Sequence, residues 1–148
     1  MVSFLLSLGQ TLIMIFKKKK AKPYKNCLLI DDNFLDNFIT SKMIETTKFA
    51  ENFVVCKYAE EALKMLKDKF IIPDMIFVDI MMRDMNGFDF IEAYKEIGIP
   101  GDTKIYMLSS SVDPADHKRV AEDPYITEFI QKNLTPEKLF ALLELNKS

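Results

Sequence analysis

Four short apolar runs, each followed by a polar residue able to do chemistry, constrain the fold of this chain more than any other feature. The runs cover residues 27–30, 75–78, 105–108 and 126–130. Each is rich in Ile, Val, Leu, Met or aromatic residues, as a parallel strand buried on both faces should be. Segments with helical spacing of apolar residues separate the runs. This alternation predicts an α/β protein with a parallel sheet.

A fifth strand and the intervening helices complete the pattern. Residues 53–56 form a further short apolar run. The helix after the first strand should present one apolar stripe, made of Phe34, Leu35, Phe38, Ile39, Met43 and Ile44. The pairs Asp113-Pro114 and Thr135-Pro136 combine an N-cap with a first-turn proline and predict where the last two helices begin. The five βα units predict a flavodoxin-like, doubly wound five-stranded parallel sheet in the order 2-1-3-4-5, with helices on both faces.

Chemically useful side chains follow these strands. Asp31 and Asp32 come after the first run, Asp79 after the second, Ser109 after the third and Lys132 after the fourth. The carboxyl ends of parallel strands meet at one edge of an open sheet, so these side chains should share one crevice. Three carboxylates brought together raise one another's pKa unless a cation intervenes. Mg²⁺, which prefers oxygen ligands, is the expected cation.

Such a site predicts phosphoryl chemistry. A carboxylate beside a metal site can be the nucleophile toward a phosphoryl donor and form an aspartyl-phosphate. The transfer needs mainly alignment and charge neutralisation, to which Lys132 would add a positive charge and Ser109 a hydrogen bond. Each residue alone has a commoner structural explanation, such as a turn, a cap or a surface charge. Their conjunction, in this order and at strand ends, favours a functional site.

The same residues, at these separations, resemble the receiver domain of bacterial two-component response regulators. The resemblance covers about residues 25–143 and includes the segments 79–87, 107–110 and 129–132. It implies a single-domain, CheY-like receiver, with Asp79 as the phosphoacceptor.

The resemblance also implies a role for the other site residues. The implied Mg²⁺ ligands are Asp32 as the main ligand, Asp31, Asp79 and the backbone carbonyl of Met81. Lys132 is implied as the lysine that pairs with the phosphoryl group.

Two further residues are implied as the output switch. The hydroxyl of Ser109 would be drawn toward a phosphoryl group on Asp79, and the ring of Phe129 would turn into the space that it leaves. Because a ring has few rotamers, the change should be nearly two-state.

Two positions depart from the family pattern. Arg83 stands where the family usually has Pro, four residues after the phosphoacceptor, and Asn133 replaces the Pro after the lysine. A cis peptide bond without Pro costs about 2.5–4 kcal/mol, so we expect the Lys132–Asn133 bond to be trans. Neither departure removes a reactive group.

Signalling is expected to run through other proteins. Because only residues 144–148 follow the last predicted helix, we expect no output domain. The expected upstream partner is a sensor histidine kinase or a histidine phosphotransfer protein. Downstream we expect a protein target or a second copy of the chain. The expected docking face combines the last two helices with the strand between them and carries Lys118, Tyr125 and Lys138.

Composition fits a small cytoplasmic domain. The chain has 148 residues, 49% of them hydrophobic, which allows one domain with an adequate core. A net charge of −2 and a pI of about 5.5 give no support to a nucleic-acid partner, which usually requires a basic face. Cys27 and Cys56 should be buried, reduced thiols. His117, the only histidine, should be exposed on a polar helix.

The N-terminus differs from the rest of the chain. Residues 2–16 are mostly apolar, and residues 17–20 are four lysines. The run is too short for a membrane-spanning helix and lacks the charge order and cleavage site of a secretory signal. Two interpretations stay open: an interfacial helix whose lysines meet anionic lipid, or a disordered or extraneous extension, with Met14 as the true start. We divide the chain into this extension, residues 1–24, and a receiver domain, residues 25–148.

Other function classes fit the sequence less well. A haloacid-dehalogenase-type phosphatase needs a second acid two residues after its nucleophile, but Met81 and Phe34 occupy those positions. Flavodoxin-type cofactor binding needs a phosphate cradle of small residues, and residues 31–33 are Asp-Asp-Asn. A degenerate receiver that only binds partners remains open, with Arg83 and Asn133 as its support. We expect a phosphoacceptor rather than an enzyme.

Overall fold

Five parallel strands form one sheet in the centre of the molecule. The computed structural model describes residues 22–146. The strands are β1 (Tyr24–Ile30), β2 (Ala50–Cys56), β3 (Met75–Asp79), β4 (Lys104–Ser109) and β5 (Glu128–Gln131). They lie in the order β2-β1-β3-β4-β5, and every neighbouring pair is parallel. The predicted strand order is confirmed.

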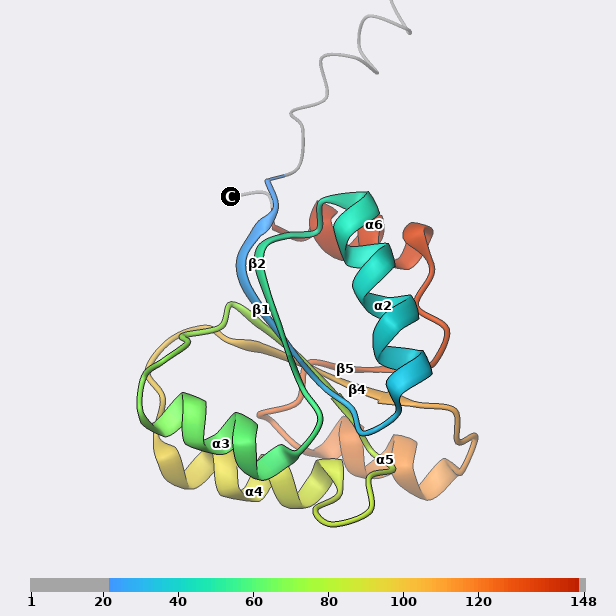
Figure 1. Cartoon of the computed structure of the whole chain (residues 1–148). Coiled ribbons are helices and arrows are strands. Elements are labelled where there is room, and N and C mark those ends of the chain that lie inside the picture. Colours follow the sequence, from blue (N-terminus) through green and yellow to red (C-terminus); the bar gives the residue numbers. More distant parts are fainter. Residues whose placement is uncertain (1–21, 147–148) are drawn as a thin grey trace, which may run out of the picture.

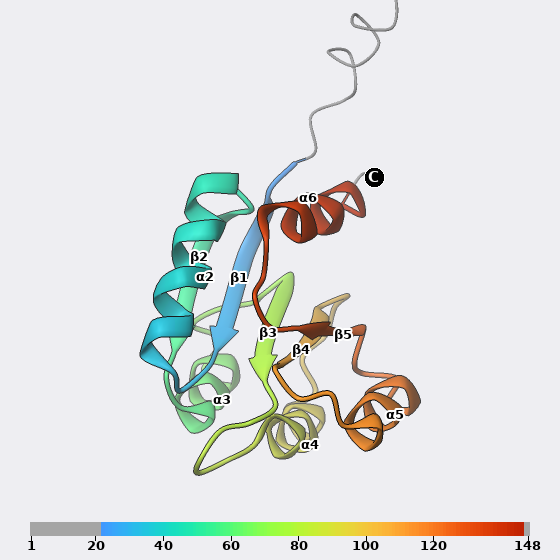
Figure 2. The same cartoon turned by 90° about the vertical axis from the view of Figure 1, so that its right-hand side faces the viewer.

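A helix follows each strand, so both faces of the sheet are covered. The helices are α2 (Phe34–Thr47), α3 (Ala59–Lys67), α4 (Gly87–Ile97), α5 (Pro114–Glu122) and α6 (Pro136–Glu144). Helices α2 and α6 lie on one face of the sheet, and α3, α4 and α5 lie on the other (Figures 1 and 2). The predicted doubly wound α/β architecture is therefore confirmed.

Each face of the sheet has its own core. Leu28 and Ile30 of β1 join the core under α3, α4 and α5, whereas Cys27 and Leu29 of the same strand join the core under α2 and α6. This division follows from the alternation of side chains along a strand. Because both faces are covered, the central strands contain continuous buried apolar runs, and polar residues follow these runs at the carboxyl ends.

Several strands begin or end away from the predicted boundaries. β1 begins at Tyr24, the last residue of the predicted extension, and β2 begins at Ala50. β5 is shorter than the predicted run 126–130, because Ile126 still belongs to the turn after α5, where its N–H bonds to the carbonyl of Asp123. An apolar residue before a strand therefore packs into the core without joining the ladder.

The predicted apolar stripe on α2 is not a core face. Four of its six residues are exposed, and only Ile44 is buried; the exposed ones are Phe34 (84%), Leu35 (62%), Phe38 (54%) and Ile39 (42%). Polar residues of the same helix turn inward instead. Asn37 donates from Nδ2 to the carbonyl of Asp31 at 2.7 Å, which anchors this rotation of the helix.

The helix starts follow the predicted capping chemistry. Asp113 accepts a hydrogen bond from the N–H of Ala115 at 2.9 Å, and Thr135 accepts one from the N–H of Lys138 at 3.3 Å. Asn33 and Asn86 cap α2 and α4 in the same way. These caps satisfy N–H groups that have no partner inside the helix.

The cysteines lie as predicted, and His117 has an additional contact. Cys27 and Cys56 are both buried and free, and burial, the largest cause, raises the pKa of the Cys56 thiol to about 11. His117 is exposed on α5, and its ring centroid lies 3.9 Å from that of Phe129 on β5.

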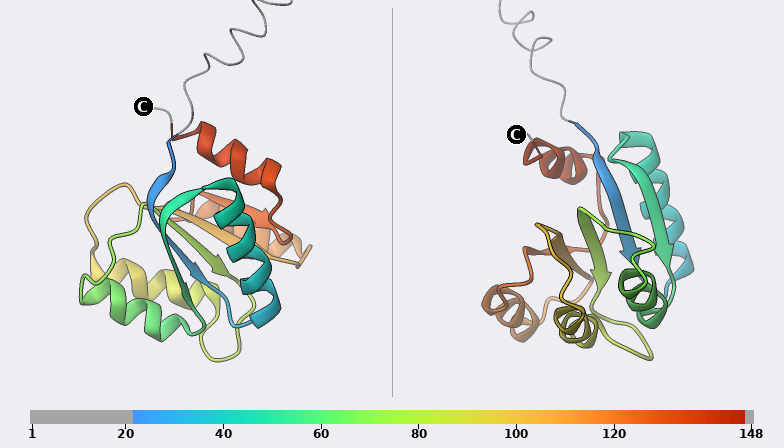
Figure 3. Two further views of the ribbon diagram at one scale, coloured as in Figure 1. Left: turned by 45° about the horizontal axis from the view of Figure 1, so that its top comes forward. Right: turned by 90° about the vertical axis from the view of Figure 1, so that its left-hand side faces the viewer.

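The interpretations of the apolar N-terminus, including Met14 as a start, lie outside the described residues. The first described residue is held near the end of α6, since Asn146 donates from Nδ2 to the carbonyl of Lys22 at 3.1 Å (Figure 3). Among residues 22–146, no helix combines the length and apolarity needed to cross a bilayer.

Gly87 should tolerate no side chain. A Cβ on this residue would meet the backbone oxygen of Asp79 at 2.5 Å and Cα of Ile80 at 3.0 Å. Replacing a helical glycine with alanine normally stabilises a helix by about 1 kcal/mol. Here we expect Gly87→Ala to lower the free energy of unfolding by about 1–3 kcal/mol, because backbone must shift. Urea denaturation checks the sign, and a more stable variant would contradict the close approach.

Candidate functional site

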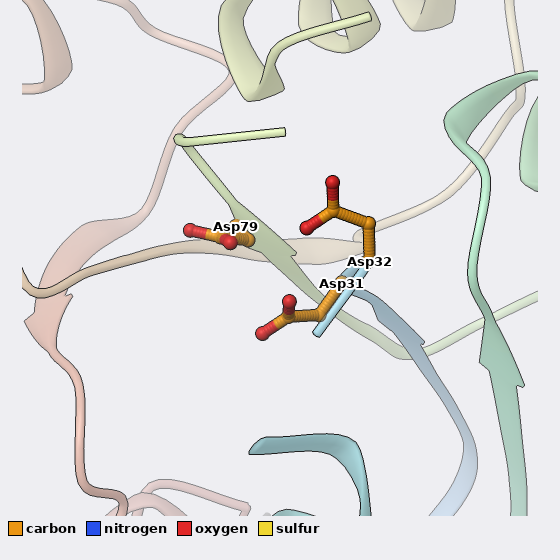
Figure 4. Close-up of side chains that lie close together, drawn as sticks. All are labelled: Asp31, Asp32 and Asp79. Carbon is orange, nitrogen blue, oxygen red and sulfur yellow. The ribbon is translucent and has the colours of Figure 1, made fainter. Parts of the chain in front are cut away.

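Three carboxylates meet at the carboxyl edge of the sheet. Asp31 and Asp32 follow β1, and Asp79 is the last residue of β3. Because β1 pairs with β3, each acid contributes an oxygen to a group in which all the oxygens lie within 4.8 Å of one another (Figure 4). In doubly wound sheets, ligands bind at such carboxyl edges. Three acids at this spacing could hold a metal ion.

Asp31 is fixed by two contacts. The side chain is buried, its Oδ1 accepts the N–H of Asn33 at 2.9 Å, and its Oδ2 lies 2.8 Å from Nζ of Lys132. A buried charge is tolerated only when it is paired and hydrogen-bonded. Asp31 is therefore held in a fixed position at the base of the site.

Asp79 is the most perturbed acid. It is 3% exposed; its Oδ1 accepts the N–H of Met81 and its Oδ2 accepts from Lys132, both at 3.1 Å. Burial first, and then the charge of Asp31, raise the pKa of Asp79 to about 6, although Lys132 and the Met81 N–H oppose the rise. The carboxylate is thus under-neutralised by protein groups, as expected of a site built for a cation.

Asp32 is the more open of the paired acids. Its Oδ2 accepts the backbone N–H of Arg83 at 3.2 Å and lies 4.0 Å from Nε of the same residue. A proline at position 83 has no N–H and could not make this bond. The departure from the family pattern at this position therefore adds a backbone contact to the acidic pair.

Lys132 connects the acids to one another. Its Nζ lies 2.8 Å from Asp31, 2.8 Å from Asp36 and 3.1 Å from Asp79. Burial lowers the pKa of Lys132, but its hydrogen bonds with Asp31 and Asp36 and the charge of Asp79 outweigh that effect and hold the pKa above its ordinary range. One ammonium with three donors thus meets three carboxylates.

Asp36 is the site residue that sequence reasoning missed. It lies three residues after the N-cap Asn33 and is the acid in the first turn of α2. Acids in that position are common because they favour the positive end of the helix dipole. Nothing in the local sequence therefore distinguishes Asp36 from an ordinary helix-start acid.

The peptide bond after the lysine is trans, as predicted, since the described residues include no cis bond. Asn133 has a φ of 74°, which proline cannot adopt and asparagine tolerates. The N–H of Lys132 donates to the carbonyl of Ser109 at 2.8 Å. These contacts direct the lysine to the acids without a proline.

The two predicted switch residues lie on neighbouring strands. Ser109 is buried at the end of β4, where its Oγ accepts the N–H of Ser111 at 3.0 Å. Phe129 is half-buried on β5 and pairs with Met107. The switch roles of Ser109 and Phe129, and the Met81 carbonyl as a metal ligand, stay predictions.

Comparison with known proteins identifies the family of this site. Residues 27–144, most of the chain, match the response regulator receiver domain. The chain belongs to this family. The predicted resemblance over about residues 25–143 is confirmed.

Similar sequences occur in a protein of comparable length and within a longer protein. Two-component response regulator ORR3 of Oryza sativa subsp. indica is 25% identical over 126 residues, covering 84% of this chain and 92% of that protein. Sensor histidine kinase CheAY of Helicobacter pylori is 29% identical over 117 residues, covering 79% of this chain and 14% of that protein.

Solved structures share the receiver fold. A two component response regulator from Cytophaga hutchinsonii has a TM-score of 0.76 and 26% identity, covering 85% of this chain and 100% of that one. Vibrio cholerae chemotaxis protein CheY4 has a TM-score of 0.68 and 23% identity, covering 83% and 98%, which supports the fold alone.

The raised pKa of Asp79 predicts a pH-dependent stability. As the pH rises, Asp79 loses its proton near pH 3.8 in the unfolded chain, but only at about pH 6 in the folded receiver. Between these values the folded state binds more protons, so its stability falls as the pH rises. Without divalent cations, we expect the parent to lose up to about 3 kcal/mol relative to Asp79→Asn between pH 4 and pH 7.

Urea denaturation of the two proteins across this pH range measures the difference. Mg²⁺ at pH 7 should then stabilise the parent more than Asp79→Asn, because a ligand that binds only the folded state adds to its stability. Parallel pH profiles in metal-free buffer would contradict the raised pKa.

Proposed function

We propose that this receiver is a phosphoacceptor that takes a phosphoryl group onto Asp79 from a histidine kinase or a histidine phosphotransfer protein and signals by binding a protein partner. One observation carries the proposal: a buried, under-neutralised carboxylate on β3 lies beside two further acids and a lysine ammonium. We include in the proposal that the protein acts as an acceptor rather than an enzyme with turnover, and that it works in the cytoplasm.

Asp79 is the nucleophile of the proposed reaction. A carboxylate oxygen forms the new O–P bond while the bond from phosphorus to the donor's imidazole nitrogen breaks, and the nitrogen keeps the electron pair. No general base is needed, since the nucleophile is already an anion. The N–H of Met81 holds Oδ1 of Asp79 and Lys132 holds Oδ2, which orients the carboxylate.

Asp31 and Asp32 are the proposed holders of Mg²⁺, together with Asp79 and the carbonyl of Met81. The clustered oxygen atoms and the lack of any nitrogen or sulfur ligand in the group fit a hard divalent cation. When bound, Mg²⁺ would offset the negative charge that develops on the phosphoryl oxygens. A cavity of about 290 Å³ opens beside Asp32 and gives a donor room to approach.

Lys132 supplies the second positive charge. Its Nζ lies 3.1 Å from Oδ2 of Asp79, which supports a role in pairing with a phosphoryl group formed on that residue. An ion pair between an ammonium and a phosphoryl group is a strong, charge-assisted hydrogen bond. Lys132 therefore both orients the acceptor and stabilises the product.

The proposed output passes through Ser109 and Phe129 to the face of α5, β5 and α6. Tyr125 is exposed on this face. Lys118 is exposed and pairs with Glu122, while Lys138 donates to the carbonyl of Gln131 and so supports the end of β5. A protein target or a second copy of the chain is the proposed partner of this surface.

A degenerate receiver gains no support from the geometry. Arg83 contributes its N–H to Asp32, and the trans bond before Asn133 still lets Lys132 reach Asp79. The two departures thus preserve the reactive groups.

Phosphorylation tests the proposal. Acetyl phosphate with Mg²⁺ should add one group of about 80 Da to the parent, detected by intact-protein mass spectrometry. Asp79→Asn should remove the adduct, and Asp32→Asn should abolish its dependence on Mg²⁺. Asp102→Asn, which removes an exposed acid before β4, at the opposite edge of the sheet, serves as the control and should leave the adduct in place.

The outcomes separate the two functions. An adduct that persists in Asp79→Asn would refute the acceptor assignment. A parent that acquires no adduct, while remaining folded, would favour the degenerate receiver.

The phosphoryl group should be long-lived. Met81 is 66% exposed beside the site, and its thioether accepts hydrogen bonds only weakly, so it cannot hold a hydrolytic water in line. Met81→Asn should shorten the lifetime about fivefold, the effect of roughly 1 kcal/mol from one hydrogen bond. Decay followed by mass spectrometry checks this. Ile72→Asn, at an exposed position before β3, is the control. Equal rates of phosphoryl-group loss in Met81→Asn and the parent would contradict this prediction.

A further inference from the structure

Lys132 keeps one carboxylate partner that the proposed reaction does not use. Of its three acid partners, Asp31 is a proposed metal holder and Asp79 is the proposed acceptor. The third, Asp36, lies 2.8 Å from Nζ through its Oδ2 and belongs to α2, outside the group of clustered carboxylates. When a cation engages Asp31 and a phosphoryl group forms on Asp79, Asp36 stays available as a carboxylate partner of the Lys132 ammonium.

The fold aims Asp36 at this position. Asn33 caps α2 by accepting the N–H of Asp36 at 3.0 Å, and Asn37 donates to the carbonyl of Asp31 at 2.7 Å. These two contacts set the rotation of the helix, which turns Phe34 and Phe38 out to solvent. Exposing these apolar side chains is unfavourable. The helix nevertheless keeps its polar side inward, with Asp36 against Lys132.

We propose that Asp36 is a positioning residue for phosphoryl transfer, which holds the ammonium of Lys132 over Asp79 after Mg²⁺ and the phosphoryl group have engaged the other two acids. This inference rests on the proposed function. Without Asp36, the lysine side chain keeps only the phosphoryl group to order it, and its rotamer freedom opposes the contact. Asp36 pairs with Lys132 rather than with Asp79, so we expect it to act through the lysine.

Asp89 serves as a matched control for the contribution of Asp36 to the start of its helix. Asp89 occupies the same place in α4, three residues after the N-cap Asn86, which accepts its N–H at 3.0 Å. Asp89 is exposed, and α4 lies on the other face of the sheet from α2 (Figure 2). Asp89→Asn therefore removes the same favourable helix-end charge without touching Lys132.

Beryllofluoride, which mimics a phosphoryl group on Asp79, is the probe. Its affinity for the full chain is measured by NMR titration at saturating Mg²⁺ in the parent, Asp36→Asn, Asp36→Glu and Asp89→Asn. We expect Asp36→Asn to bind about fivefold more weakly, the upper range for a part-exposed ion pair. Asp36→Glu should recover most of the affinity, and Asp89→Asn should match the parent.

A second readout follows the lysine itself. In the beryllofluoride-bound state, the ammonium ¹H–¹⁵N signal of Lys132 should shift in Asp36→Asn and stay in place in Asp89→Asn. Urea denaturation should show that Asp36→Asn loses more stability than Asp89→Asn, because it removes the ion pair with Lys132 in addition to the helix-end charge.

The results distinguish the inference from the proposed function. A parent that binds no beryllofluoride would overturn both. A parent that binds it, with Asp36→Asn binding as tightly or more tightly, would overturn the positioning role alone. Equal loss of affinity in Asp36→Asn and Asp89→Asn would also overturn it, because the effect would then come from helix ends.

Discussion

The contact of one ammonium with three carboxylates is the interaction on which the site depends. Asp31 and Asp79 are almost fully buried and lie close enough to repel. Lys132 reaches both, and the N–H groups of Asn33 and Met81 each hold a further oxygen. Breaking a buried pair of this kind leaves an uncompensated charge, which is strongly destabilising. The carboxyl edge of the sheet is therefore organised around the position of a single side chain.

The requirement to place that lysine extends to the loop after β5. Asn133 adopts a left-handed conformation, and Lys138 donates from Nζ to the carbonyls of Gln131 and Asn133 at 3.2 and 3.4 Å. A proline at position 133 could not adopt this φ. At position 83 a proline would remove the N–H that Asp32 accepts. Both positions therefore have a backbone feature that proline cannot provide: a positive φ at Asn133 and a donated N–H at Arg83.

Helix α2 shows how a polar site competes with burial. A helix normally turns its apolar stripe toward the core, but here the hydrogen bond from Asn37 to the carbonyl of Asp31 and the ion pair of Asp36 turn the polar stripe inward. The helix is held to the sheet mainly near Ile44, toward its C-terminal end. Its first turns consequently expose Phe34 and Phe38. Polar contacts with buried partners thus decided the rotation of this helix.

The sequence alone determined the alternation of strands and helices, and with it the doubly wound fold and its strand order. The convergence of Asp31, Asp32, Asp79 and Lys132 followed, because the carboxyl ends of parallel strands share one edge. It also determined the caps at Asp113 and Thr135, which depend on neighbouring residues only. Tertiary structure decided the role of Asp36 and the rotation of α2, since their partners lie on other elements. The pattern of apolar residues in a helix reports which face could be buried, whereas contacts across the fold select the face that is.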